Sequence, residues 1–171
     1  MRIISGYFKG KKIFEPFDQV TRPLKDLTKE SIFNILKHSK HLDFKIEDSS
    51  VLDLFCGSGS FGLECISRGA SNVTFVENYP PVLKILLRNI DKLKCHKKID
   101  IIKEDIFEKN FLLNQNKKFR LIFLDPPYRE NRLNILIDKI VNSKILLKEA
   151  IIIIHRHKKT KTLLPKKIKI I

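Results

Sequence analysis

The sequence has 171 residues, with 34 Lys and Arg against 19 Asp and Glu, a formal net charge of +15 and three cysteines. This length suits one domain with a sizeable core, and the longest aliphatic run, 150–154, is far too short to cross a membrane. The three scattered cysteines favour neither a disulfide framework nor a zinc site, and they indicate a reduced, cytoplasmic setting. The positive charge favours a polyanionic partner, although the excess of Lys over Arg is also typical of compositional drift.

The chain is predicted to begin with a basic arm and a helix. Residues 3–14 have the pattern of a β-hairpin or extended segment that bends at Gly6 and Gly10. Pro23 then opens a helical pattern that ends near His38. The apolar positions of that helix predict a buried face made by Leu24, Leu27, Ile32, Ile35 and Leu36.

Strand and helix patterns alternate over the rest of the chain. Continuous apolar runs predict strands at 51–55, 72–77, 99–103, 119–124 and 151–155, and amphipathic patterns predict helices at 60–68, 81–93 and 132–141. The middle helix is expected to bury Leu83, Leu86, Leu87, Ile90 and Leu93. Because such strands are typical of a parallel sheet covered on both faces, we expect an α/β domain over residues 21–171, preceded by the arm at 1–20. Residues 166–171 are compatible with a sixth strand.

A glycine-rich turn follows the first predicted strand. Gly57, Gly59 and Gly62 complete a GxGxxG pattern, which lets a ligand approach the backbone and leaves free N–H groups at the start of the next helix. No Lys follows the glycines as it does in a nucleotide triphosphatase loop. The turn therefore predicts a nucleotide-like cofactor without identifying it.

Three carboxylates accompany this turn. Asp53 precedes it, Glu77 ends the second strand, where it can accept from ribose hydroxyls, and Asp105 follows the third, where it can accept from an adenine amine. Asp53 would repel the pyrophosphate of a dinucleotide and attract the ammonium group of S-adenosylmethionine. We therefore predict S-adenosylmethionine as the cofactor, bound by Asp53, Phe55, Gly57, Ser58, Gly59, Glu77, Asp105 and Ile106.

The strand at 119–124 ends in Asp125, Pro126, Pro127 and Tyr128. The Asp125 carboxylate and the Pro126 carbonyl can accept both protons of a planar exocyclic amine, which localises the lone pair on its nitrogen. Tyr128 can stack on a base that has left its helix or loop. These four residues are the predicted catalytic set, and they indicate methylation of a nucleobase amine.

The motifs together resemble the RsmD-type methyltransferases, which methylate the N2 of a guanine in bacterial 16S rRNA. Residues 2–12 are similar to that family's RIIGGxxRGRxL opening, 22–36 to RPTxDRVRExLFNxL, 53–59 to DLFAGSG and 63–70 to LGLExxSRGA. The resemblance implies a Rossmann-like class I methyltransferase fold with strand order 3-2-1-4-5-7-6 and a 16S rRNA or small-subunit substrate. We expect a monomer without a metal site.

The basic arm and the chain end carry two further expectations. RNA binding is predicted to depend on Arg2, Lys9, Lys11, Lys12 and Arg22. The chain stops where the family continues into a closing strand, so we expect the fifth strand to lack its usual neighbour or to pair irregularly with 166–171. His155 and His157, which flank Arg156, are interpreted as surface or RNA-facing residues.

Three other functions remain open from the sequence. A DNA adenine or cytosine amino-methyltransferase shares the motif at 125–128, but this chain has no region left over for DNA target recognition. A non-catalytic RNA-binding assembly factor would not need Asp53, Glu77 and Asp125. A dehydrogenase is disfavoured by Asp53 and by the same 125–128 motif.

Overall fold

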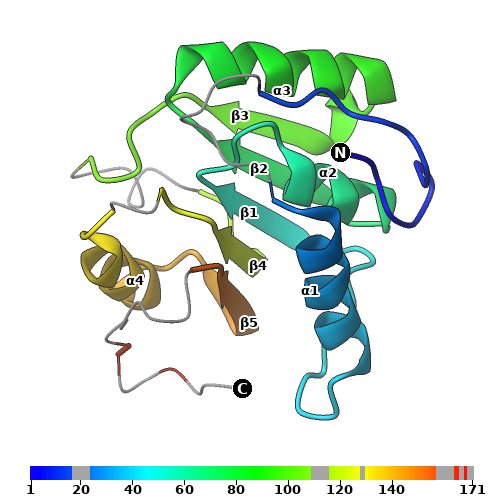
Figure 1. The fold of residues 1–171 in the computed structure, drawn as a ribbon. Coiled ribbons are helices and arrows are strands. Elements are labelled where there is room, and N and C mark those ends of the chain that lie inside the picture. Colours follow the sequence, from blue (N-terminus) through cyan, green and yellow to red (C-terminus); the bar gives the residue numbers. More distant parts are fainter. Residues whose placement is uncertain (17–23, 109–115, 128–129, 157–163, 166–167, 169–171) are drawn as a thin grey trace.

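The computed structural model describes residues 1–16, 24–108, 116–127, 130–156, 164–165 and 168. They contain a parallel sheet of five strands in the order β3-β2-β1-β4-β5 (Figure 1). The strands are β1 (Ser50–Leu54), β2 (Asn72–Val76), β3 (Ile99–Ile102), β4 (Phe119–Leu124) and β5 (Leu146–Ile154). The helices are α1 (Asp26–His38), α2 (Ser60–Ser67), α3 (Pro80–Leu93) and α4 (Leu133–Asn142), with a 3-10 turn at His96–Lys98. The predicted α/β fold class is confirmed.

Helices cover both faces of the sheet. Val51 and Phe123 belong to the core shared with α1, α2, α3 and the N-terminal arm, whereas Leu52 and Leu124 belong to the core shared with α4. Figure 1 shows α4 on the side of the sheet opposite to the other three helices. Because successive strand residues face opposite ways, Asp53 shares the face of Val51, towards α2.

The buried face of α1 differs from the prediction. Leu27 and Ile35 are 75% and 60% exposed, whereas Lys29, Phe33 and Leu36 are buried. Phe33 lies inward because its ring stacks on that of Phe61, with the centroids 5.1 Å apart. Leu24 and Leu36 are buried as predicted, and Ile32 is half-buried against the core. Apolar spacing therefore misplaced Leu27 and Ile35, and it missed Lys29, whose polar partners only the folded chain provides.

Lys29 is completely buried and joins α1 to the arm and α2. Its Nζ donates to the Arg2 carbonyl at 2.7 Å and to Ser60 Oγ at 3.1 Å. The carboxylates of Glu64 and Asp26 each lie 3.7 Å from it. Burial lowers the pKa of Lys29, and the two carboxylates oppose that shift.

The arm folds back on itself and packs on α2. The N–H of Ile3 donates to the Lys11 carbonyl at 3.0 Å, and an antiparallel bridge joins Arg2 to Lys12. Gly6 has a φ of +79°, and a Cβ there would lie 1.9 Å from the carbonyl oxygen of Ser67. Glycine therefore permits both the bend and the close approach to α2.

Two further elements differ from the sequence predictions. Leu87 of α3 is 40% exposed, while Asn89, which the pattern did not select, is fully buried. β5 begins five residues before the predicted start. The apolar sequence pattern is interrupted at the point where the register of β5 shifts opposite Phe119 and Leu121, with Glu149 at a φ of 57°. Within the described residues β5 pairs with β4 alone. Most of the proposed sixth strand at 166–171 lies outside those residues.

Candidate active site

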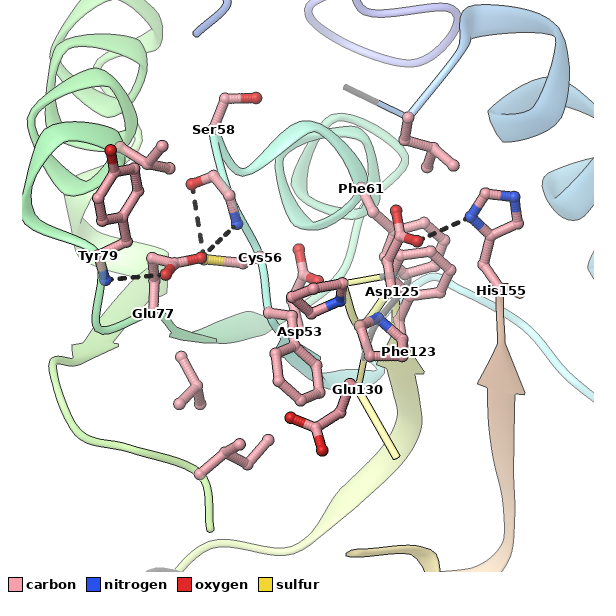
Figure 2. A pocket seen from close by; sticks show the side chains of 18 of the residues that line it. Asp53, Cys56, Ser58, Phe61, Glu77, Tyr79, Phe123, Asp125, Glu130 and His155 are labelled. Carbon is pink, nitrogen blue, oxygen red and sulfur yellow. Dashed lines mark hydrogen bonds and ion pairs between the residues drawn. The ribbon is translucent and has the colours of Figure 1, made fainter. Parts of the chain in front are cut away.

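A cavity of about 640 Å³ lies at the carboxyl ends of the strands (Figure 2). Ligands of open α/β sheets bind at this edge. Most of the predicted site residues line it, namely Asp53, Phe55, Gly57, Ser58, Glu77, Asp105, Ile106, Asp125, Pro126 and Pro127. Gly59 is not part of its lining, and Tyr128 lies outside the described residues.

Asp53 provides a buried carboxylate in the wall of this cavity. The residue is 1% exposed, and its Oδ2 accepts the N–H of Gly62 at 2.9 Å. Burial raises the pKa of Asp53 well above its ordinary value, and the nearby carboxylates of Asp125 and Glu77 raise it further. A carboxylate in such surroundings favours a cationic ligand over a phosphate.

Glu77, directly after β2, is held by three backbone donors. Its Oε2 accepts the N–H of Gly57 at 3.0 Å, and its Oε1 accepts those of Asn78 and Tyr79 at 3.0 and 2.9 Å. Figure 2 shows the Glu77 carboxylate beside the turn that follows β1. The Glu77 side chain thus joins the ends of β1 and β2. It also lines the cavity, and its carboxylate can accept a further hydrogen bond.

The three glycines serve packing and internal hydrogen bonds. The N–H groups of Gly57, Gly59 and Gly62 donate to Glu77, the Cys56 carbonyl and Asp53. The N–H groups of these three glycines are therefore already bonded within the protein. A Cβ on Gly59 would lie 2.4 Å from a methyl of Leu86, and one on Gly62 would lie 2.3 Å from the ring of Phe75. These glycines let α2 approach the sheet and α3 closely.

The ends of β1 and β3 form an apolar part of the wall. Phe55 has a φ of 58°, which is uncommon for a residue other than glycine, and its ring centroid lies 6.0 Å from that of Phe107. The guanidinium of Arg132 lies 3.7 Å from the Phe107 ring centroid. The Oδ1 of Asp105 accepts the N–H of Phe107 at 2.9 Å. A flat ring with an edge amine suits this combination of aromatic surface and acceptor.

Asp125 directly follows β4 and lies in the other half of the cavity. Its Oδ1 is 2.8 Å from Nδ1 of His155, as Figure 2 shows. Nearby, the rings of Phe61 and Phe123 stack with their centroids 3.9 Å apart and their planes inclined by 14°. Asp125 therefore lies beside an aromatic stack that packing holds in place.

Sequence reasoning missed several charged or titratable residues of the cavity lining, among them Glu130, Arg132, His155 and Arg156. His155 and Arg156 follow β5, the neighbour of β4. Asp125 was selected because it follows a strand, and the same criterion would have selected these two residues. Arg132 donates to both oxygens of Glu130 at 2.8–3.0 Å, and these bonds lower the pKa of that carboxyl. The interpretation of His155 as a surface or RNA-facing residue overlooked its contact with Asp125.

The predicted RNA-binding residues that the structure describes are not part of the cavity lining. Arg2, Lys9, Lys11 and Lys12 are exposed on the arm, and Arg22 lies outside the described residues. Arg2 contacts Asp26, with 3.8 Å between Nε and Oδ2, and the amine of Lys11 lies 4.9 Å from the Phe8 ring centroid. These four cationic side chains of the arm are thus exposed and are not part of the cavity lining.

The described residues show neither a metal-binding cluster nor a membrane-spanning helix. Over the residues placed here, no group of three or more His, Cys, Asp or Glu is arranged to hold a metal ion. None of the described helices combines the length and apolar character needed to span a membrane.

A sequence model of the family described as Conserved hypothetical protein 95 matches residues 1–171. The chain belongs to this family. Its relatives include the ribosomal RNA small subunit methyltransferase D of Escherichia coli K12, 32% identical over 89% of this chain and 72% of the relative. That of Buchnera aphidicola from Acyrthosiphon pisum is 34% identical over 96% of this chain and 82% of the relative. The resemblance to the RsmD family is confirmed, and the chain is a methyltransferase of that family.

Solved structures agree with this assignment. The Escherichia coli protein yhhF covers 97% of this chain and 86% of its own length, with 28% identity and a TM-score of 0.80. The methylase HI0767 of Haemophilus influenzae covers 96% of this chain and 86% of its own length, with 32% identity and a TM-score of 0.74. A more distant structure, SMU.776 in complex with SAH, is 18% identical over 76% of this chain and 35% of its own length, with a TM-score of 0.61. It shares the fold.

Proposed function

We propose that this RsmD-family methyltransferase transfers a methyl group from S-adenosylmethionine to the exocyclic N2 of a guanine in 16S rRNA. One observation carries the proposal: the carboxylates of Asp53 and Asp125 line a single cavity, one suited to a cationic ligand and one at the amine-binding motif. The relatives named as small subunit methyltransferases support the choice of RNA. We propose further that the enzyme is a cytoplasmic monomer acting on free 16S rRNA or on a small-subunit particle.

The residues of the cofactor half fit S-adenosylmethionine. Asp53 would bind its ammonium group, Glu77 its ribose hydroxyls and Asp105 its adenine amine, while Phe55 and Ile106 border the ring. Gly57, Ser58 and Gly59 would shape the turn around it. When bound, this cofactor supplies a methyl group on a positively charged sulfur. The acidic lining suits that charge and disfavours the pyrophosphate of a dinucleotide.

The residues of the target half would orient the guanine. Asp125 and the carbonyl of Pro126 would accept the two N2 protons, which favours a pyramidal nitrogen with a localised lone pair. Pro126 and Pro127 have no backbone N–H to compete for those acceptors. We assign the stacking role to Tyr128. Positioning and electrostatics of this kind provide most of the catalysis when the electrophile is already strong.

The arm would hold the RNA outside the cavity. Arg2, Lys9, Lys11 and Lys12 of the arm at 1–20, together with Arg22 of the domain, would bind phosphates. The arm would then act as an RNA-binding unit attached to the catalytic domain. Such contacts position the RNA without reading its sequence. The relatives named as ribosomal RNA methyltransferases favour an RNA substrate over DNA.

The test is methyl transfer followed by identification of the product. The protein would be incubated with labelled S-adenosylmethionine and either RNA or small-subunit particles from cells that lack it. We expect N2-methylguanosine in 16S rRNA, and comparison of the two preparations identifies the substrate form. N6-methyladenine or N4-methylcytosine in a DNA control would instead favour the DNA amino-methyltransferase. Absence of transfer to either, with intact RNA binding, would favour the assembly factor.

A further inference from the structure

The contact between His155 and Asp125 is built into the sheet. The backbone N–H of His155 donates to the Leu124 carbonyl at 2.9 Å, which continues the β4–β5 ladder by one residue beyond Ile154. This bond fixes the backbone of His155 beside the residue that precedes Asp125. The two side chains then meet, Nδ1 to Oδ1, at 2.8 Å, with 38% and 24% of their surfaces exposed (Figure 2).

Arg156, the residue after His155, contacts the far end of the segment that runs from Asp125 to Glu130. Arg156 donates from Nη2 to the carbonyl of Glu130 at 2.7 Å. The exit of β5 therefore contacts the segment that starts at Asp125 at both of its ends. Pro126 and Pro127 lack the N–H groups with which a strand end is usually fastened, so side chains from β5 provide this restraint.

We propose that His155 is a positioning residue for Asp125. A carboxylate can only accept, so the geometry points to an imidazole that donates its Nδ1–H to Asp125 Oδ1. The torsion about the carboxylate is otherwise soft, and this bond fixes it. The other oxygen, Oδ2, is then presented to the target amine. The inference rests on the proposed role of Asp125.

Substitutions at His155 separate positioning from structure. An Asn side chain carries its amide nitrogen about where Nδ1 lies, whereas Gln carries its nitrogen nearer the position of Nε2. We expect His155→Leu and His155→Gln to lower the rate of methyl transfer at saturating RNA by about 10- to 100-fold, the scale of one charged hydrogen bond. His155→Asn should recover a substantial part of that rate. The KM for RNA and the Kd for S-adenosylmethionine should change by less than about threefold in all three variants.

A second measurement detects the contact between His155 and Asp125 independently of catalysis. Nitrogen NMR of the free protein should show the Nδ1–H tautomer for His155, and Asp125→Ala should abolish that preference. An Nε2–H tautomer that is insensitive to Asp125 would overturn the inference, as would His155→Leu with the wild-type rate. A rate lost equally in His155→Asn and His155→Gln would also overturn it. If wild-type protein does not methylate RNA, the proposed function fails, and the tautomer still decides whether His155 holds Asp125.

Discussion

The side-chain amide of Asn89, fully buried on α3, donates to the carbonyl of Ser58 in the glycine turn at 3.0 Å. The same amide group accepts from the N–H of Phe14 at 2.7 Å and donates to its carbonyl at 3.1 Å. Asn89 therefore joins the end of the arm to the cofactor turn. No sequence motif indicated this link.

Replacing Asn89 should weaken the fold and the cofactor turn together. We expect Asn89→Leu to reduce the free energy of unfolding by about 1–3 kcal/mol, because it leaves buried backbone groups without partners. S-adenosylmethionine affinity should fall as well. Denaturant titration and calorimetry measure the two effects. Asn34→Leu, at an exposed position of α1, is the control, and equal losses in both variants would contradict the role of Asn89.

Cofactor binding should release a proton from Asp53. In the free protein burial raises the pKa of this carboxyl, and a bound ammonium group would lower it again. Between the bound and free pKa values the affinity should therefore rise with pH. Calorimetry in buffers of different ionisation enthalpy counts the proton, and Asp53→Asn should bind the cofactor weakly and without this linkage.

The raised pKa of Asp53 also affects folding. Since the folded state holds this proton more tightly than the unfolded state, its contribution to stability should decline as the pH rises from the ordinary carboxyl pKa through the raised one. Asp53→Asn should remove this decline in pH-dependent denaturant titrations.

Glu77 should matter for the choice of cofactor. Glu77→Ala is expected to cost about 1–3 kcal/mol of S-adenosylmethionine binding, through loss of the proposed ribose contacts and of the bond that orders Gly57. NAD should bind far more weakly than S-adenosylmethionine to the wild-type protein. Calorimetry tests both statements, and tighter binding of NAD would rule out the proposed cofactor.

Substitutions of Asp125 should separate chemistry from cofactor binding. Asp125→Ala should abolish methyl transfer, while the Kd for S-adenosylmethionine stays within a few-fold. Asp125→Asn should retain part of the activity, because its amide oxygen can still accept one hydrogen bond. Single-turnover assays with labelled cofactor measure this, and a wild-type rate in Asp125→Ala would mean that another group holds the amine.

The salt dependence of RNA binding tests the arm. Neutralising Lys9, Lys11 and Lys12 together should reduce the slope of log affinity against log salt by up to about three, and by less for single-stranded RNA. Lys37, in the last turn of α1, and Lys40 and Lys45, which follow the helix, are exposed. They provide a control with the same change in net charge. Identical slopes for the two triple variants would indicate that only the total charge matters.

Residues at strand ends were predictable because a parallel sheet brings them together whatever lies between them. This is why Asp53, Glu77, Asp105 and Asp125 were found from sequence, and the structure places them around one cavity. Asn89 and Lys29 could not be found this way, since their burial depends on partners that only the fold supplies. The predicted face of α1 was right for Leu24 and Leu36 and wrong for Leu27 and Ile35. The early start of β5 was not predicted because Lys148 and Glu149 interrupt the apolar run, and the irregular register of the strand accommodates them.

The docking of the arm on later segments has a consequence for synthesis. Ser5 reaches its partner Glu64 only 59 residues later, and Phe14 reaches Asn89 only 75 residues later. At about 5–20 residues per second, the nascent arm waits on the order of ten seconds before α3 exists. During that time it is a short basic peptide at the surface of a translating ribosome, next to abundant RNA. The order in which the chain is made therefore exposes the arm to RNA, the ligand proposed for it, before the arm can dock on α2 and α3.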